Sequence, residues 1–82
     1  MEIKPLRKDI EDFIRENKLE KKWSKAKQLF LKDIKYPSLR TELMEPKWHG
    51  IYSFRLDKKY RALFFIVKGE VEVFKITKHY KR

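Results

Sequence analysis

The side chains best suited to chemistry on a phosphate lie in the C-terminal half of this sequence. Arg55 and Arg61 fall in two neighbouring apolar segments, and His79 precedes Tyr80 near the end. Guanidinium groups bind phosphate oxygens bidentately, and an imidazole with an unperturbed pKa of about 6.5 exchanges protons near neutral pH. Tyr80 offers a ring that can stack on an unpaired base. These residue types predict a site that binds a phosphodiester and transfers a proton, although a histidine this close to a terminus is more often simply exposed.

The segment before these strands adds two carboxylates and a short aromatic motif. Glu42 and Glu45 both lie close to basic residues, and either can take the proton of a ribose hydroxyl. The alternative for each is an exposed loop acid, and for Glu45 we favour that alternative. Lys47, Trp48 and His49 combine a cation, an aromatic ring and an imidazole, as a contact with single-stranded nucleic acid does. Trp48 can equally cap the core.

Length and composition bound the class of protein. Eighty-two residues make a single domain, 1–82, with a modest core. The absence of cysteine excludes disulfides and thiolate chemistry, and two histidines argue against a histidine-rich metal site. No apolar run approaches the roughly 20 residues of a membrane span, and the charged start lacks a signal-peptide core. We therefore expect a cytoplasmic domain with no membrane partner.

Charge indicates the kind of partner. Lysine and arginine number 22 against 12 acids, for a net charge of +10, and aromatic residues make up 15% of the chain. A field of this sign attracts phosphates, acidic proteins or anionic membranes, and aromatic rings stack on bases. The alternative is that the lysines only keep a small protein in solution. We favour nucleic acid as the partner.

Helical spacing organises the residues from about 6 to 34. One apolar stripe consists of Leu6, Ile10, Phe13 and Ile14, and a second of Trp23, Ala26, Phe30 and Ile34. A break at Asn17-Lys18 separates them and predicts two helices in an antiparallel hairpin. Residues 2–4 can form a short strand, and Pro37 ends the second helix because the residue before a proline leaves the α region.

The last third of the chain changes to strand-like composition. Residues 51–56, 60–67 and 71–77 are rich in aromatic and β-branched residues and are separated by short turn segments. This order predicts an α+β fold, in which an N-terminal helical hairpin packs on a C-terminal antiparallel sheet of three to four strands.

Loop length decides which side chains face each other across these strands. A three-residue loop at 57–59 places Arg55 opposite Arg61, and we expect a second three-residue loop at 68–70, whose glycine suits a left-handed position. A two-residue second loop would turn His79 away from Arg61, because side chains alternate along a strand. The apolar pattern favours the three-residue loop.

This register predicts an apolar face and a mixed face. The expected apolar face under the helices consists of Tyr52, Phe54, Leu56, Tyr60, Ala62, Phe64, Ile66, Phe74 and Ile76, with Glu72 near the turn. The mixed face carries both arginines with Lys75, Thr77 and His79, and also Leu63, Phe65, Val67, Val71 and Val73. We assign Lys75 and Lys78 to RNA binding and expect a partner to cover the apolar part of the mixed face.

Two arginines placed directly opposite each other need an explanation. Their repulsion costs a few tenths of a kcal/mol or more. A phosphate between Arg55 and Arg61 would reverse the sign of this interaction. The alternative is that each arginine pairs with a nearby acid, either Asp57 or one from the connector at 35–49. Spacing alone leaves both interpretations open.

The chain resembles the RelE/ParE superfamily of bacterial toxin–antitoxin toxins. The resemblance lies in an ordered set of segments: residues 37–40 (Pro-Ser-Leu-Arg), 42–43 (Glu-Leu), 50–55 (Gly-Ile-Tyr-Ser-Phe-Arg), 59–64 (Lys-Tyr-Arg-Ala-Leu-Phe) and 79–80 (His-Tyr). It covers nearly the whole chain. The terminal His-Tyr is most similar to the YoeB branch of mRNA interferases, which enter the ribosomal A site and cut mRNA by in-line attack of the ribose 2′-hydroxyl.

This resemblance implies a role for each candidate residue. It implies Glu42 as the general base, Arg55 and Arg61 as clamps for the phosphate and the transition state, His79 as the general acid, and Tyr80 as a stacking or positioning residue. Charge develops on the phosphoryl oxygens during the reaction, so fixed cations lower its barrier.

Some features depart from the family pattern. The YoeB branch ends at the tyrosine, whereas Lys81-Arg82 follow here. The RelE branch has no histidine acid, so Lys47 is an alternative base. ParE-like members poison DNA gyrase and need no acid–base pair. The presence of Glu42 and His79 together with Arg55 and Arg61 therefore favours the nuclease.

The resemblance implies the toxin of a type II toxin–antitoxin system, a ribosome-dependent and metal-independent mRNA endoribonuclease that inhibits translation without a cofactor. Its expected partners are the ribosome, mRNA and a cognate antitoxin that covers residues such as Leu63 and Phe65. The alternatives are a ParE-like DNA gyrase inhibitor, a non-catalytic basic RNA-binding domain and, last, a scaffold domain with incidental charge.

Overall fold

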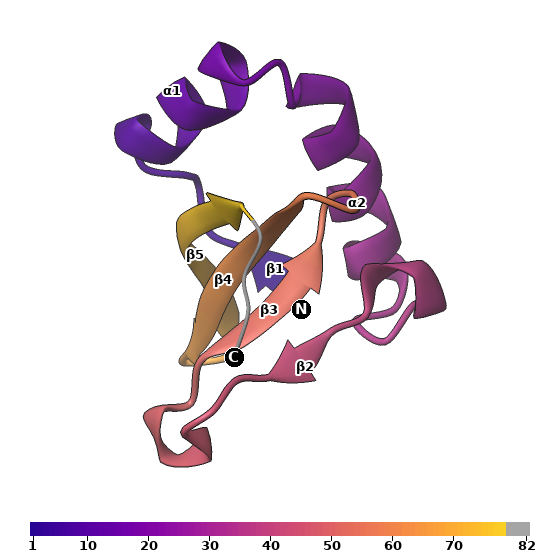
Figure 1. The fold of residues 1–82 in the computed structure, drawn as a ribbon. Coiled ribbons are helices and arrows are strands. Elements are labelled where there is room, and N and C mark those ends of the chain that lie inside the picture. The colour runs from indigo at the N-terminus through magenta and orange to yellow at the C-terminus, as the bar shows by residue number, and fades with distance from the viewer. Residues whose placement is uncertain (79–82) are drawn as a thin grey trace.

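Two helices precede most of a five-stranded sheet in the computed structural model, which describes residues 1–78 (Figure 1). In chain order the elements are β1 (Glu2–Ile3), α1 (Lys8–Glu16), α2 (Glu20–Lys32), the 3₁₀ turn η1 (Pro37–Leu39), β2 (Glu42–Leu43), the 3₁₀ turn η2 (Lys47–His49), β3 (Tyr52–Arg55), β4 (Tyr60–Val67) and β5 (Glu70–Lys78). The strand order is β1-β5-β4-β3-β2, and all neighbours are antiparallel except β1 and β5. The predicted α+β class is confirmed. The short strand expected at residues 2–4 is confirmed as β1, and one further edge strand, β2, was not predicted.

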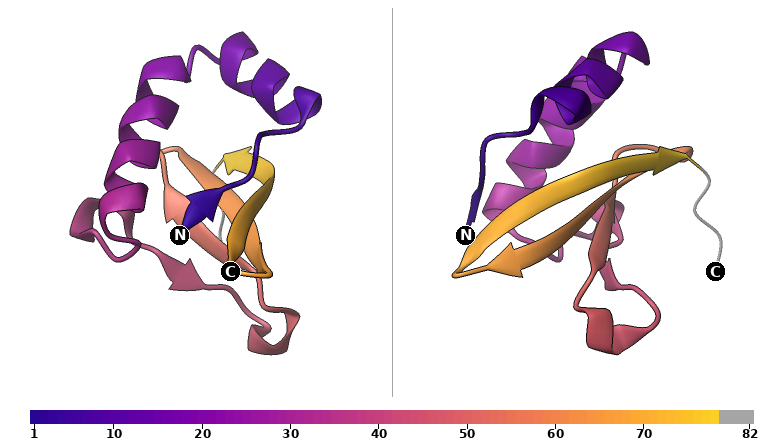
Figure 2. Two further views of the ribbon diagram at one scale, coloured as in Figure 1. Left: turned by 180° about the vertical axis from the view of Figure 1, so that it is seen from behind. Right: turned by 90° about the vertical axis from the view of Figure 1, so that its left-hand side faces the viewer.

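The two helices are joined by the predicted break. Lys18 adopts a left-handed backbone with φ of 55°, and the Asn17 side chain donates to the Phe13 carbonyl at 2.8 Å. Both helices lie on one face of the sheet and splay apart from this turn (Figure 2). Among residues 1–78, no helix combines the length and the apolar character that crossing a membrane requires.

The core lies between the helices and the sheet. Its centre is a group of three fully buried rings, Phe30 of α2, Phe54 of β3 and Phe64 of β4, whose centroids are 4.8–5.7 Å apart. Trp23 of α2 stacks on Phe54 at 6.1 Å. Truncating a buried Phe typically costs about 3–5 kcal/mol, so these rings hold α2 on the sheet.

The turn between β4 and β5 differs from the prediction. Val67 pairs with Glu70, so Lys68 and Gly69 form a two-residue loop, and the predicted three-residue loop is wrong. Both loop residues have positive φ, 51° and 81°. Two left-handed residues in a row give the turn whose twist matches that of antiparallel strands, and a lysine accepts this conformation here.

A bulge then restores the predicted register farther along β5. Phe64 pairs with Val73 and Leu63 with Lys75, which leaves Phe74 as an extra residue. A bulge of this kind shifts pairing by one residue. Thr77 therefore still lies on the face of Arg61, as predicted, and is its direct cross-strand partner.

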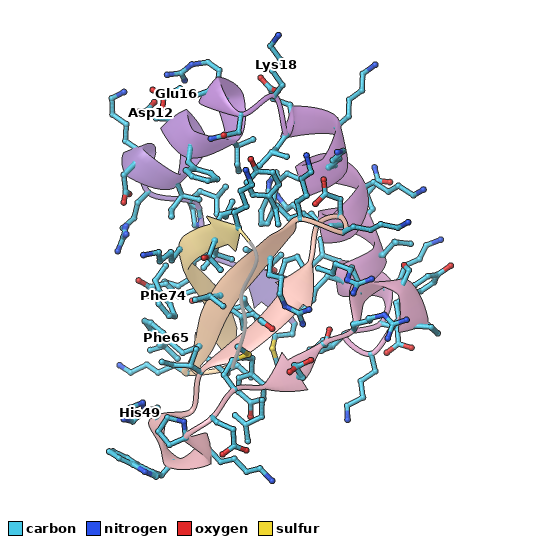
Figure 3. The ribbon with its side chains drawn as sticks, viewed as in Figure 1. Asp12, Glu16, Lys18, His49, Phe65 and Phe74 are labelled. Carbon is cyan, nitrogen blue, oxygen red and sulfur yellow. The ribbon has the colours of Figure 1, made fainter. Side chains whose placement is uncertain are left out.

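The part of β5 between the turn and the bulge is turned over relative to the prediction. Val71 and Val73 are buried in the core rather than on the mixed face. Phe74 leaves the expected apolar face, and its ring stacks on Phe65 at 5.2 Å (Figure 3). Glu72 is on the mixed face, where it accepts from Lys4 at 3.4 Å. The physical reason is the alternation of side chains, which a shift of one residue inverts.

Candidate functional site

The paired arginines lie where β3 ends and β4 begins. Arg55 and Arg61 are direct partners across the two strands, which confirms the prediction. The turn between them is held by Asp57, whose carboxylate accepts the main-chain N–H groups of Lys59 and Tyr60, each at 2.7 Å. The predicted loop at 57–59 therefore has a structural basis, because one carboxylate satisfies two amide donors of the turn.

Arg61 is held by three partners. Its Nε donates to Ser53 Oγ at 3.1 Å, one Nη donates to the Arg40 carbonyl at 3.0 Å, and the same Nη is 3.4 Å from Glu42 Oε2. The side chain is only 15% exposed. Ser53, directly behind it, is fully buried. These three partners therefore hold the guanidinium in one orientation.

Burial and neighbouring cations weaken the hold of Arg61 on its proton. Burial lowers the pKa of the Arg61 guanidinium most, Arg55 and Arg40 lower it further, and Glu42 raises it. Arginine stays charged at any physiological pH, so this shift describes the cost of the cation in its site rather than a titration. Three cations face one carboxylate, and an additional anion is electrostatically favoured there.

Glu42 is the acid that lies beside Arg40, Arg55 and Arg61, which we call the arginine group. It lies on β2 opposite Ser53, and its side chain is 47% exposed. The structure thus supports the alternative in which Arg61 pairs with an acid of the connector. Asp57 does not serve Arg55, because it forms an ion pair with Lys22 of α2 at 2.6 Å. Within residues 1–78, Arg55 makes no ion pair with an acid.

The aromatic motif of the connector is not part of this group. Lys47, Trp48 and His49 form η2 and precede β3, whereas Arg55 ends it. At about 3.3 Å per residue, the four-residue strand puts about 10 Å between its ends. Trp48 is 82% exposed, so the alternative in which it caps the core is wrong. His49 lies at this far tip of the molecule (Figure 3), and Glu45 is exposed, as we favoured.

The two lysines assigned on β5 lie on different faces. Lys75 is exposed opposite Leu63, which shares its face with Arg61. Lys78 is opposite Tyr60, whose ring packs edge-on against Phe13 of α1 at 5.9 Å. Lys78 therefore belongs to the helix-covered face, away from Arg61. His79 and Tyr80 lie outside the described residues.

Two contributors to the site were missed by reasoning from residue types. Ser53 looked like a polar residue in an apolar strand, but its place two positions before Arg55 on the mixed face was a usable signal. Arg40 was part of the Pro-Ser-Leu-Arg segment, and it ends η1 with a left-handed φ of 47°. This conformation aims its carbonyl at Arg61, a detail that residue spacing does not reveal.

Groups of three or more His, Asp or Glu side chains placed to hold a metal ion do not occur within residues 1–78. The chemistry that the arrangement offers is instead binding of an anion by Arg61, Arg55 and Arg40, with the Glu42 carboxylate beside it. Comparison with protein-family models and with curated proteins finds no match for this chain.

Proposed function

We propose that this protein is the toxin of a type II toxin–antitoxin system, a ribosome-dependent endoribonuclease that cuts mRNA. The observation that supports the proposal best is the placement of Glu42 at 3.4 Å from the Arg61 guanidinium, with Arg55 and Arg40 nearby. Nucleases of this kind need cations for the phosphate and a base beside it. The resemblance to the RelE/ParE superfamily and the net charge of +10 point the same way.

In the proposed reaction the scissile phosphate displaces Glu42 from Arg61. A phosphate oxygen takes the place of the Glu42 oxygen on the guanidinium, and the freed carboxylate accepts the proton of the ribose 2′-hydroxyl. The 2′-oxygen attacks phosphorus in line and forms a bond to it as the bond to the 5′-oxygen breaks. His79 gives a proton to the leaving 5′-oxygen. The products are a 2′,3′-cyclic phosphate and a 5′-hydroxyl.

Primer extension on mRNA held in programmed ribosomes tests this proposal. We expect wild-type protein to cut within the A-site codon, and Arg61→Ala, Glu42→Gln and His79→Ala each to lose at least about 10² of the rate. Ser24→Ala, an exposed change on α2, is the control and should cut at the wild-type rate. Cutting by His79→Ala at the wild-type rate would move the acid to another residue.

Absence of any cut by wild-type protein would contradict the nuclease. A DNA gyrase supercoiling assay then separates the two alternatives. A ParE-like protein inhibits supercoiling, whereas a plain RNA-binding domain neither inhibits supercoiling nor cuts mRNA. The proposal places the protein in the cytoplasm, where ribosomes translate.

We also propose that the partner antitoxin covers the sheet face that carries no helix. The stacked pair Phe65 and Phe74 lies on this face with Leu63 and Val67, all partly exposed. Apolar patches bordered by charge are typical of protein interfaces. The net charge of +10 favours an acidic segment as the occupant.

A further inference from the structure

A basic cleft lies beside the arginine group, between α2 and the β3–β4 turn. It has a volume of about 400 Å³, within the usual range of ligand sites. We call it the lysine cleft. Its lining consists of Lys22, Lys25, Ala26, Leu29, Ser38, Leu39, Arg55, Leu56, Asp57 and Lys58.

The lysine cleft combines cationic and apolar lining. Four of its residues are cations, and the one acid, Asp57, is already paired with Lys22 at 2.6 Å. Burial would raise the pKa of Asp57, but the bonds from Lys22 and from two turn amides outweigh it and lower this pKa. The cleft therefore keeps an excess of positive charge at neutral pH. Its remaining wall is mostly aliphatic and contains no aromatic ring.

Arg55 connects the lysine cleft with the arginine group. It lines the cleft and is also the direct cross-strand partner of Arg61. Partners of this kind have Cα atoms about 5 Å apart. A nucleic-acid strand with one phosphate on Arg61 therefore brings its next nucleotide to Arg55 and the cleft.

We infer that the lysine cleft binds the nucleotide adjacent to the phosphodiester held at Arg61. This inference deepens the proposed function and rests on it. The aliphatic wall takes the sugar and base through apolar contact, and Lys25, Lys58 and Arg55 take the adjoining phosphate. Apolar contact does not distinguish the hydrogen-bonding edges of the bases, so we expect no base preference from the aliphatic wall.

Titration with a non-cleavable RNA tests the inference without any need for catalysis. The probe is a 2′-O-methyl trinucleotide, and the readouts are amide chemical shifts and the dissociation constant. We expect shifts to cluster at residues 22–29, 38–39 and 55–58 and around Arg61. The double variant Lys25→Gln/Lys58→Gln should bind about tenfold more weakly.

A matched variant separates the cleft from general charge. Lys27→Gln/Lys68→Gln also removes one exposed α2 lysine and one exposed turn lysine, both outside the cleft. It should change the dissociation constant by less than about twofold. Equal weakening by both double variants, or shifts that avoid the cleft, would overturn the inference.

Two further arms identify the source of the nucleotide and the point of failure. Arg61→Ala should weaken binding of the trinucleotide. Adenosine 5′-monophosphate should bind far more weakly than the trinucleotide. Tight binding of the monophosphate that ignores Arg61→Ala would show a free-nucleotide site and overturn the adjacent-nucleotide assignment. If ribosomal mRNA stays uncut while the trinucleotide maps to both sites, the nuclease fails and the RNA-binding path stands.

Discussion

Glu42 has two roles at the site, as the ion-pair partner of Arg61 and as the proposed general base. In the free protein the two side chains are 3.4 Å apart and partly neutralise each other. Because the Glu42 side chain is 47% exposed, the ion pair is worth only about 0–1 kcal/mol, and a phosphate can replace it readily. In the proposed reaction, the event that fills the site therefore also releases the base, and proton abstraction is coupled to correct placement of the substrate.

Ser53 is predicted to position Arg61. Replacing it with alanine removes the acceptor of the Nε–H, and leaving a buried donor unpaired costs about 1–3 kcal/mol. We expect Ser53→Ala to fold and to cut mRNA about tenfold more slowly, with the loss in kcat rather than KM. Ser24→Ala is the matched control. Full activity of Ser53→Ala would show that the Arg40 carbonyl and Glu42 suffice to hold the guanidinium.

Asp57 is predicted to make stability depend on acid pH. Its pKa is lowered in the folded protein, so its ionised form stabilises the fold above the unfolded value of about 3.9. That contribution is lost as pH falls through the lower folded value. Asp57→Asn should reduce the free energy of unfolding by about 1 kcal/mol at pH 7 and by less as pH falls below about 4.

Urea unfolding of wild type and Asp57→Asn across this pH range measures the effect. Lys22→Gln removes the same ion pair by changing its other partner. The difference in free energy of unfolding between wild type and Lys22→Gln should also become smaller as pH falls below about 4. A difference between wild type and Asp57→Asn that stays constant down to pH 2 would exclude the charge of Asp57 as its cause.

At this scale, alternation and one loop length were enough to predict that Arg55 lies opposite Arg61. The partners of Arg61 were harder to find. Arg40 contributes a carbonyl, which every residue possesses, and its orientation comes from a left-handed backbone at the end of η1. Residue types carry no information on such a contact.

Strand β5 shows why a register is difficult to predict from loop length alone. The turn at Lys68-Gly69 is one residue shorter than expected, and the bulge at Phe74 adds that residue back. The two changes cancel at Thr77, so its place on the face of Arg61 was predicted correctly for an incomplete reason. Between them lie Val71 and Val73, whose faces were predicted wrongly. An alternating Val-Glu-Val pattern fits either face until the bulge is known.

The bulge leads to a prediction about deletions in β5. Without Phe74, the remaining residues alternate regularly and keep the pairs Val73–Phe64 and Lys75–Leu63. We expect this deletion to fold and to lose about 1–2 kcal/mol, because the stack on Phe65 and the bond from Arg7 to the Phe74 carbonyl disappear. Urea unfolding gives the loss, and amide chemical shifts report the register.

Deletion of Val73 is the matched comparison. It moves the Phe74 ring into the core position that Val73 occupies, where overpacking costs about 3 kcal/mol. The two single-residue deletions should therefore differ clearly in stability although they shorten the strand equally. If both are equally stable, Phe74 is not the extra residue.

Across the whole molecule, helices and sheet divide the surface into a covered and an uncovered sheet face. The order of elements was predictable because long periodic segments dominate the chain. Edge strand β2 has only two residues, too few to show a period, so the full width of the sheet was not predicted. The unpredicted strand β2 places Glu42 beside β3, and for this reason the arginine group lies near that edge of the sheet.

The uncovered face gives a prediction for the proposed antitoxin complex. Phe65→Glu places a charge in the apolar patch and should abolish co-purification with the co-expressed antitoxin. Leu31→Glu, at an exposed apolar position on α2, is the control and should leave the complex intact. An intact complex with Phe65→Glu would move the antitoxin to another surface. Loss with Leu31→Glu as well would point to a misfolded chain.

The two tryptophans have opposite environments, and this makes the protein its own optical probe. Trp23 is partly buried against Phe54, whereas Trp48 stands in solvent at the tip of η2. Fluorescence from Trp48 is open to quenching by iodide, and that from Trp23 is shielded. In a Trp48→Phe variant the fluorescence of Trp23 therefore reports unfolding. In a Trp23→Phe variant the fluorescence of Trp48 reports binding of a partner at η2. Each event can be followed without attaching a dye.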